Sequence, residues 1–262
     1  MPLHLQFNQH IHTGYRPLSL TPRESLSTIF YVHNETVNIL THGLAILYVL
    51  LTVPFLLPWA KQGILGVILS LCHLIGAISP WIGSSVYHIF MNLDYGVEFY
   101  RQLLQIDMLG IWLCQSFGAL PMVMTAVHCQ TDNVWYCCVG AYCILSYWGL
   151  LKAMHADSPW ERRLCFMPPF MARMLILCLR TLGISGGDPE ALLHIVLQDL
   201  LAVIGAIIGA LRVPEKWIPG KVDYMMNSHN LMHVMVVLAV YSMHTATILD
   251  LAWMANPSSC IA

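Results

Sequence analysis

Five long stretches of this sequence contain no charged side chain. They are residues 36–60, 62–93, 108–131, 133–151 and 224–249, and the shortest spans 19 residues. A transmembrane helix needs about 20 mostly apolar residues. Only 10% of the 262 residues are charged and 57% are hydrophobic, whereas soluble domains carry about 25% charged residues. We therefore predict an all-α, multi-pass membrane protein and exclude a soluble enzyme, a nucleic-acid binder and a disordered chain.

The charge-free stretches predict five membrane-spanning helices, and two further apolar segments predict two more. The seven spans are expected near residues 38–58, 65–90, 105–126, 134–152, 166–183, 191–211 and 229–253. The second span is longer than a bilayer core of about 30 Å requires, so we expect it to tilt or to bend at Pro80. Uniformly apolar runs of this length exclude a β-barrel, whose strands alternate over about 10 residues.

Basic residues indicate the orientation of the seven spans. With the N-terminus in the cytoplasm, nine Lys and Arg fall inside and only Lys61 falls outside. Residues 1–37 are then a cytoplasmic segment with a short interfacial helix within 24–37. Residues 38–253 are the transmembrane domain, and residues 254–262 are a short outer tail in an extracellular or lumenal space. The sequence does not distinguish the Golgi from the plasma membrane.

We expect the cysteines and most of the ionisable side chains inside the spans to have structural roles. The nine cysteines include no C-x₂-C pair, so we expect neither a disulfide framework nor a thiolate zinc site. We expect Asp199 to form an ion pair with Arg173 or Arg180, the alternative being that Arg173 meets a substrate headgroup. Four histidines are expected to make ordinary contacts between helices, namely His42, His73, His194 and His244.

Five polar residues stand apart from this background. Ser84 and His88 are four residues apart and share a helix face, as do His229 and His233. In the predicted orientation all four, with Asp107, lie at one level near the cytoplasmic ends of three helices. Three imidazoles with an open fourth position are typical of a catalytic zinc site, and bound zinc lowers the pKa of its water to about 7.

These five residues are therefore candidates for a zinc centre. We predict His88, His229 and His233 as the metal ligands. Asp107 would orient the water or act as general base. Ser84 would hydrogen-bond to the water or to a developing oxyanion. The alternative is that the histidines only form hydrogen bonds between helices.

Several stretches of the chain resemble one known family. They are TGYRP at 13–17, FYVHNETVNILTHG at 30–43, S-x₃-H at 84–88, Asp107, and PEKWIPGKVDYMMNSHNLMH at 214–233. They resemble the progestin and adipoQ receptors, a group related to hemolysin III-like proteins and alkaline ceramidases. The resemblance implies seven helices, a cytoplasmic N-terminus and zinc on the same three histidines, with Ser84 and Asp107 completing the site. It also implies membrane lipids, ceramide or another sphingolipid, as partners, because adiponectin receptors are associated with ceramide hydrolysis.

Two functions follow from the residues and the resemblance together. The first is a zinc-dependent, ceramidase-like amide hydrolase of sphingolipid metabolism. The second is a non-enzymatic receptor or signalling scaffold with structural zinc, whose protein ligand the sequence does not reveal. A zinc transporter is disfavoured because no path of acidic residues or histidines crosses the bundle. A retinal pigment is excluded because residues 224–249 contain no lysine for a Schiff base.

Overall fold

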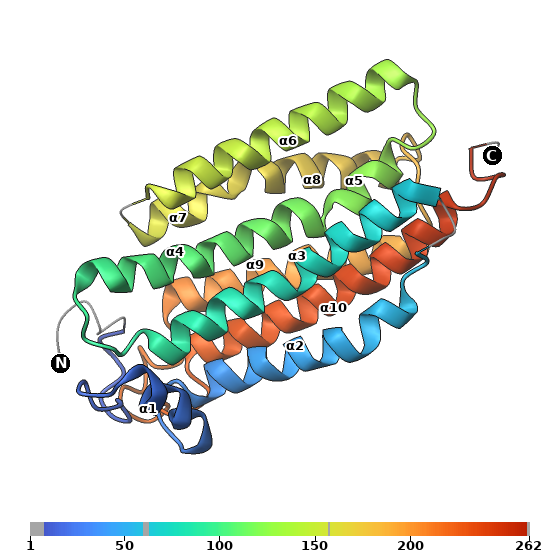
Figure 1. The fold of residues 1–262 in the computed structure, drawn as a ribbon. Coiled ribbons are helices and arrows are strands. Elements are labelled where there is room, and N and C mark those ends of the chain that lie inside the picture. Colours follow the sequence, from blue (N-terminus) through green and yellow to red (C-terminus); the bar gives the residue numbers. More distant parts are fainter. Residues whose placement is uncertain (1–7, 60–62, 157, 261–262) are drawn as a thin grey trace. The chain divides into compact units, whose positions relative to one another are not determined.

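The computed structural model describes residues 8–59, 63–156 and 158–260, and these residues form helices and no strand (Figure 1). Seven helical segments among them are long and apolar enough to cross a membrane, which confirms the predicted spans. The protein is an integral, multi-pass membrane protein. Its helices are α1 Pro22–Ser27, η2 Thr28–Phe30, α2 Thr36–Leu56, α3 Gly63–Phe90, α4 Val97–Leu113, η3 Cys114–Gly118, α5 Leu120–Ala126, α6 Asp132–Met154, α7 Pro159–Cys165, α8 Met167–Thr181, α9 Ala191–Leu211 and α10 Ser228–Met254.

The outward face of α2 carries large apolar side chains. In α2 only 28% of the most apolar 18-residue stretch is buried. Leu51 and Phe55 are 71% and 84% exposed. Contiguous apolar side chains on a surface mark a place that meets something other than water. These side chains are therefore expected to face lipid.

The third span differs from its prediction at its start and in its middle. It begins at Val97, eight residues earlier than predicted, because its first turns carry Glu98 and Arg101, which lie outside the charge-free run. Between α4 and α5 the backbone forms a π-helical turn, Cys114–Gly118. Pro121 follows, and a proline ring clashes with the carbonyl four residues earlier in a regular helix. The span therefore consists of three consecutive segments.

The predicted interfacial helix within 24–37 lies slightly earlier, as α1 and η2. Thr21 caps α1: its side chain accepts a hydrogen bond from the amide of Glu24, whose carboxylate accepts one from the amide of Thr21. The hydrogen bonds that Thr21 donates to this carboxylate, from its amide and from its hydroxyl, lower the pKa of Glu24. The helix ends at Phe30, and both Phe30 (91% exposed) and Val32 (71% exposed) are open to the surroundings. Such apolar exposure suits a segment at a membrane surface.

The described residues divide into two compact units, and the division falls inside α2, α3, α4, α9 and α10. The first unit consists of the described residues of 1–47, 81–107 and 199–239. The second consists of the described residues of 48–80, 108–198 and 240–262. All five candidate site residues belong to the first unit.

Two contacts in the second unit correct the sequence analysis. Arg180, one of the two partners predicted for Asp199, instead pairs with Asp250 through two hydrogen bonds of 2.7 and 2.8 Å. The planar guanidinium matches both oxygens of this carboxylate, which lies near the end of α10. The pairing of Asp199 with Arg173 stays a prediction. In addition, Cys129 and Cys260 form a disulfide, which the scattered cysteines did not lead us to expect. These are the two cysteines of the predicted outer segments.

Candidate metal centre

Polar side chains from the segment that precedes α10 hold its first turn. Asn227 accepts hydrogen bonds from the amides of His229 and Asn230, at 3.1 and 3.0 Å. Glu215 accepts from the amide of Ser228 at 2.7 Å and also from its hydroxyl. These bonds satisfy amides that have no partner inside a helix. His229 consequently lies in the first turn and His233 one turn later on the same face.

The end of α3 is held by a buried arginine from the N-terminal segment. Arg16, 3% exposed, donates to the carbonyl of His88 at 2.6 Å and to that of Ile89 at 2.8 Å. Ser25 also donates to the carbonyl of Ile89, at 2.6 Å. The last carbonyls of a helix lack partners within it. Arg16 thus fixes the last turn of α3, which carries His88. Arg16 is the arginine of the TGYRP stretch, so this stretch lies at the end of α3.

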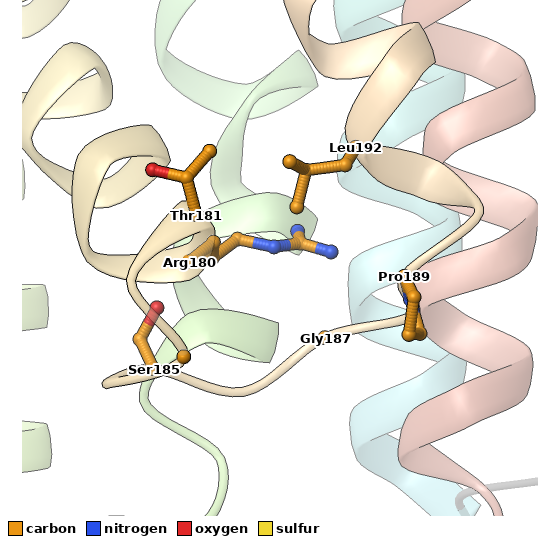
Figure 2. A pocket seen from close by; sticks show the side chains of 7 residues that line it. Arg180, Thr181, Ser185, Gly187, Pro189 and Leu192 are labelled. Atoms are coloured by element: carbon orange, nitrogen blue, oxygen red, sulfur yellow. The ribbon is translucent and has the colours of Figure 1, made fainter.

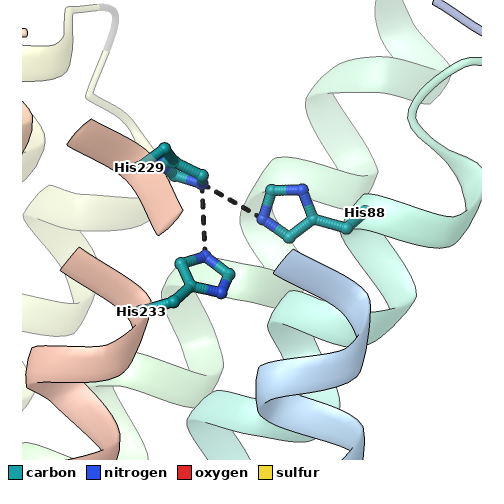
Figure 3. A group of neighbouring side chains, drawn as sticks. All are labelled: His88, His229 and His233. Atoms are coloured by element: carbon teal, nitrogen blue, oxygen red, sulfur yellow. Dashed lines mark hydrogen bonds between the residues drawn. The ribbon is translucent and has the colours of Figure 1, made fainter. Parts of the chain in front are cut away.

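The three predicted ligands converge in the first unit (Figure 3). His229 Nε2 lies 3.2 Å from His88 Nε2 and 3.2 Å from His233 Nε2. One ligand atom from each residue lies within 4.8 Å of the others. His88 and His233 are each 2% exposed. A cluster of nitrogen donors shielded from water is therefore present where two helices meet.

The donor set fits a metal ion better than it fits hydrogen bonding. His229 Nε2 faces two other Nε2 atoms, and a neutral imidazole nitrogen can donate at most one hydrogen bond. Zinc binds histidine nitrogen at about 2.0–2.1 Å, which in a tetrahedral site separates the nitrogens by about 3.3 Å. The two separations measured from His229 Nε2, 3.2 Å each, match this value. Three convergent imidazoles suit a transition metal such as zinc, copper, iron or nickel.

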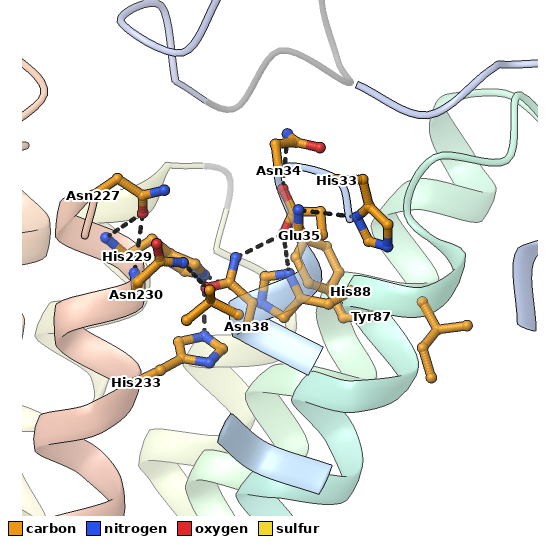
Figure 4. A network of polar contacts seen from close by, with 12 residues as sticks. His33, Asn34, Glu35, Asn38, Tyr87, His88, Asn227, His229, Asn230 and His233 are labelled. Carbon is orange, nitrogen blue, oxygen red and sulfur yellow. Dashed lines mark hydrogen bonds and ion pairs between the residues drawn. The ribbon is translucent and has the colours of Figure 1, made fainter. Parts of the chain in front are cut away.

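Behind the histidines lies a buried network that the sequence analysis did not identify (Figure 4). Glu35 Oε2 lies 2.7 Å from His88 Nδ1 and accepts a hydrogen bond from Asn38 at 2.7 Å. Asn38 in turn accepts from Asn230 at 2.7 Å. Burial alone would raise the pKa of Glu35, but the hydrogen bonds from His88 and Asn38 outweigh it and lower that pKa to about 2. Glu35 is therefore a carboxylate at neutral pH.

Ser84 and Asp107 lie in the same unit as the three histidines. Ser84 is one turn before His88 and is 4% exposed, and its hydroxyl has no hydrogen-bond partner among the described residues. Asp107 lies against α3 at this level, since a Cβ on Gly83 would be 3.1 Å from its Cα. Neither side chain hydrogen-bonds to the three histidines within the described parts of the chain. Their roles as base and hydrogen-bond donor stay predictions.

His42 behaves differently from the ordinary interhelical contact predicted for it. Its ring stacks on that of His233, with centroids 3.9 Å apart. Both of its ring nitrogens are buried and lack a hydrogen-bond partner in the part of the chain that the structure describes. The same holds for the indole nitrogen of Trp81. By contrast His73 and His244, in the second unit, hydrogen-bond to each other at 3.1 Å, as predicted.

A cavity of about 340 Å³ in the second unit is a weaker candidate for a site (Figure 2). Arg180, Ser185 and Leu192 are among the residues that line it. The guanidinium of Arg180 is neutralised by Asp250, as described above, and it also donates to the carbonyl of Asp188 at 3.0 Å. Among the described residues that line the cavity, none therefore presents an unsatisfied positive charge to an anionic headgroup.

Sequence reasoning missed Arg16, Glu35 and Asn38 because each lies at or outside the end of a span. Their types are ordinary for such positions, and spacing does not show which helix end they reach. The one available signal was that Glu35 is the last charge before the first apolar run, with Asn38 one turn on. An acid at that boundary is unremarkable until its partner is known.

Comparison with known proteins places the chain among described relatives. The family described as haemolysin-III related matches residues 30–244. Progestin and adipoQ receptor family member 4 of Homo sapiens is 38% identical over 97% of this chain and 92% of its own length. In the sequence, the stretches LQFNQHIHTGYRP and PEKWIPG look most like that member. The adiponectin receptor protein of Drosophila melanogaster is 29% identical over 92% of this chain and 56% of its own. Membrane progestin receptor beta of Homo sapiens is 26% identical over 92% of this chain and 72% of its own length.

Proposed function

Because the chain belongs to the haemolysin-III-related family, which includes the progestin and adipoQ receptors, we propose that it is a zinc-dependent lipid amidase acting on ceramide-like sphingolipids. The observation that carries the proposal is the cluster of three imidazoles, in which His229 Nε2 lies 3.2 Å from the Nε2 atoms of both His88 and His233. His88, His229 and His233 would hold the ion. When bound, zinc would supply Lewis acidity and a water ligand with a pKa of about 7.

The chain's own residues would supply the remaining chemistry. Asp107 would take a proton from the attacking water and deliver it to the amide nitrogen as the C–N bond breaks. The products are then a fatty acid and an amine. Ser84 would donate a hydrogen bond to the carbonyl oxygen as negative charge develops there. The burial of the histidines would keep bulk water away from these charges.

Unpartnered polar groups beside the cluster support a polar ligand. Ser84, His42 and Trp81 each present a buried polar atom without a hydrogen-bond partner in the described residues. Buried polar groups in native proteins are nearly always hydrogen-bonded to protein, water or ligand. The amide and hydroxyl groups of a sphingolipid offer such partners, while its chains suit the apolar outer faces of the helices.

A second candidate is a receptor or signalling scaffold in which the metal is structural. It is favoured by the deep burial of His88 and His233 and by the relatives, several of which are named as receptors for adiponectin or progestin. A structural site would stabilise the fold without turning over lipid. The two candidates share the metal and differ in whether lipid is hydrolysed.

Metal content and lipid turnover together test the proposal. We expect the purified protein to carry zinc and to release fatty acid from ceramide. His229→Ala should lose the metal and lower the rate about a thousandfold, since metal catalysis supplies several kcal/mol. His155→Ala, which removes an exposed imidazole, is the matched control and should retain both. Metal analysis and mass spectrometry of the released fatty acid are the measurements.

Two results would decide against the amidase. If His229→Ala lost its zinc and still hydrolysed ceramide, the metal mechanism would be wrong. If the wild-type protein held zinc but released no fatty acid at high protein concentration, while His88→Ala lowered thermal stability, the receptor or scaffold would be the better description.

A further inference from the structure

The two ring nitrogens of His88 face two different partners. Nε2 points to the histidine cluster, 3.2 Å from His229 Nε2. Nδ1 lies 2.7 Å from the carboxylate of Glu35, and the side chains of both residues are almost completely buried. Glu35 is just ahead of α2, while His88 is in the last turn of α3. A carboxylate from a different segment of the chain thus lies directly behind one of the proposed ligands (Figure 4).

This contact selects the form of the imidazole that can bind a metal. A carboxylate accepts hydrogen bonds and cannot donate them, so His88 Nδ1 must carry the proton. A neutral ring protonated at Nδ1 has its lone pair on Nε2, the nitrogen that faces the cluster. The hydrogen bond also fixes the rotation of the ring. Without it, the opposite tautomer and other ring orientations would be open to His88.

The carboxylate is itself held in place from two sides. Asn38 donates to Oε2 at 2.7 Å, and Asn34 donates to Oε1 at 3.2 Å. Asn38 also accepts a hydrogen bond from Asn230, which lies between His229 and His233 in α10. The segment that orients His88 is therefore tied to the helix that carries the other two ligands, and all three helices share one buried polar network.

We propose that Glu35 is the positioning residue of the zinc site, the carboxylate that sets the tautomer and orientation of His88 and raises its basicity toward the metal. The inference rests on the proposed zinc site. It assigns no proton-transfer step to Glu35, because the carboxylate acts only through the ring of His88. Partners of this kind strengthen metal binding about 10–100-fold in other histidine sites.

The test compares Glu35→Gln with a matched loss of buried charge elsewhere in the same unit. Glutamine preserves the shape of the side chain and removes its charge. The control is Asp223→Asn. Asp223 is as buried as Glu35, at 2%, and accepts hydrogen bonds from His12 and Thr13. Both variants remove one buried carboxylate, but only Glu35→Gln changes the group behind a proposed ligand.

Zinc affinity, measured by competition with a chelator on the full-length protein, is the main readout. We expect Glu35→Gln to weaken zinc binding 10–100-fold and Asp223→Asn to change it less than twofold. The visible spectrum of the cobalt-loaded protein should shift in Glu35→Gln and not in Asp223→Asn, because it reports ligand geometry directly. Added zinc should raise the melting temperature of Glu35→Gln by less than that of the wild type.

A second variant covers the case in which Glu35→Gln does not fold. Asn38→Ala keeps the carboxylate and removes the amide that holds Oε2, so zinc affinity should fall by a smaller factor, below that of Glu35→Gln where both can be measured. If zinc affinity and the cobalt spectrum were unchanged in the variant that folds, Glu35 would be a structural residue and the proposal would be wrong.

The result also separates this inference from the proposed activity. A wild-type protein that binds no zinc would overturn both. A wild-type protein that binds zinc and hydrolyses no ceramide would overturn only the amidase, since zinc affinity and the cobalt spectrum do not depend on turnover.

Discussion

The pKa of His33, a residue near the site, is controlled mainly by burial. Its side chain is 2% exposed, and Nδ1 accepts a hydrogen bond from the amide of Glu35 at 3.1 Å. Burial, helped by the positive charge of Arg16, lowers the pKa of His33 from 6.5 to about 4, although Glu35 acts in the opposite direction. The ring is therefore neutral in the folded protein, as an acceptor must be.

This shift predicts loss of stability in mild acid. Between pH 6.5 and about 4 the unfolded chain binds a proton at His33 that the folded chain excludes. The free energy of unfolding should therefore fall as the pH drops through this window. We expect His33→Asn to show a flatter fall in melting temperature between pH 7 and pH 4.5 than the wild type. Thermal unfolding in detergent at a series of pH values measures it.

His155→Asn serves as the control for this experiment, because His155 is exposed. Its melting temperature should follow the wild-type curve. A curve for His33→Asn parallel to that of the wild type would show that His33 does not contribute to acid sensitivity.

At the level of helices, glycines set how closely two spans approach. A Cβ on Gly83 of α3 would collide with the backbone carbonyl of Ile106 in α4 and lie 3.1 Å from the Cα of Asp107. Backbone atoms cannot move aside as a flexible side chain can. Small residues let membrane helices pack backbone to backbone. Gly83 thus brings Asp107 to the helix that carries Ser84 and His88.

We therefore predict that Gly83→Ala destabilises the protein. The added methyl must push α3 and α4 apart, and overpacking typically costs about 1–3 kcal/mol. The melting temperature in detergent should fall. Gly43→Ala in α2 is the matched control, because a Cβ there would meet nothing within 4 Å.

The control should leave the melting temperature unchanged or raise it, since alanine is favoured over glycine in a helix by about 1 kcal/mol. Equal melting temperatures for Gly83→Ala and Gly43→Ala would contradict the close approach of α3 and α4.

On the scale of the whole molecule, two independent features favour one orientation. Nine basic residues fall on the predicted cytoplasmic side and one on the other. The disulfide joins Cys129 and Cys260, which both lie in segments predicted to be outside. Disulfides persist in oxidising compartments and are rare in the cytosol. Charge and redox chemistry thus favour a cytoplasmic N-terminus.

The orientation predicts where the chain can be glycosylated in cells. A glycosylation tag fused after Ala262 should be modified and the same tag fused before Met1 should not, as judged by a mobility shift that glycosidase removes. The natural sequon at Asn34 should also stay unmodified. Cys129 and Cys260 should react with a maleimide only after reduction. Glycosylation of the N-terminal tag or of Asn34 would contradict this orientation and show that the N-terminus lies outside.

Much of the architecture could be predicted from the sequence. Seven apolar runs determine seven spans because bilayer thickness and helix rise leave little choice of length. Histidines at i and i+4 share a face because of helix geometry alone. The exact ends of the spans could not be predicted in the same way. The start of α4 lies among Glu98 and Arg101, where helix continues beyond the apolar run and hydropathy no longer marks it.

Only the tertiary structure decided which polar residues meet. Arg180 could have paired with several acids, and the choice of Asp250 depends on where two distant helices end. Likewise nothing in the spacing of Glu35 shows that it reaches His88, 53 residues away. The sequence by itself determined the membrane class, the spans and the candidate ligands, because hydropathy and helix periodicity are local properties. Contacts between segments depend on packing in three dimensions, and no local pattern contains them.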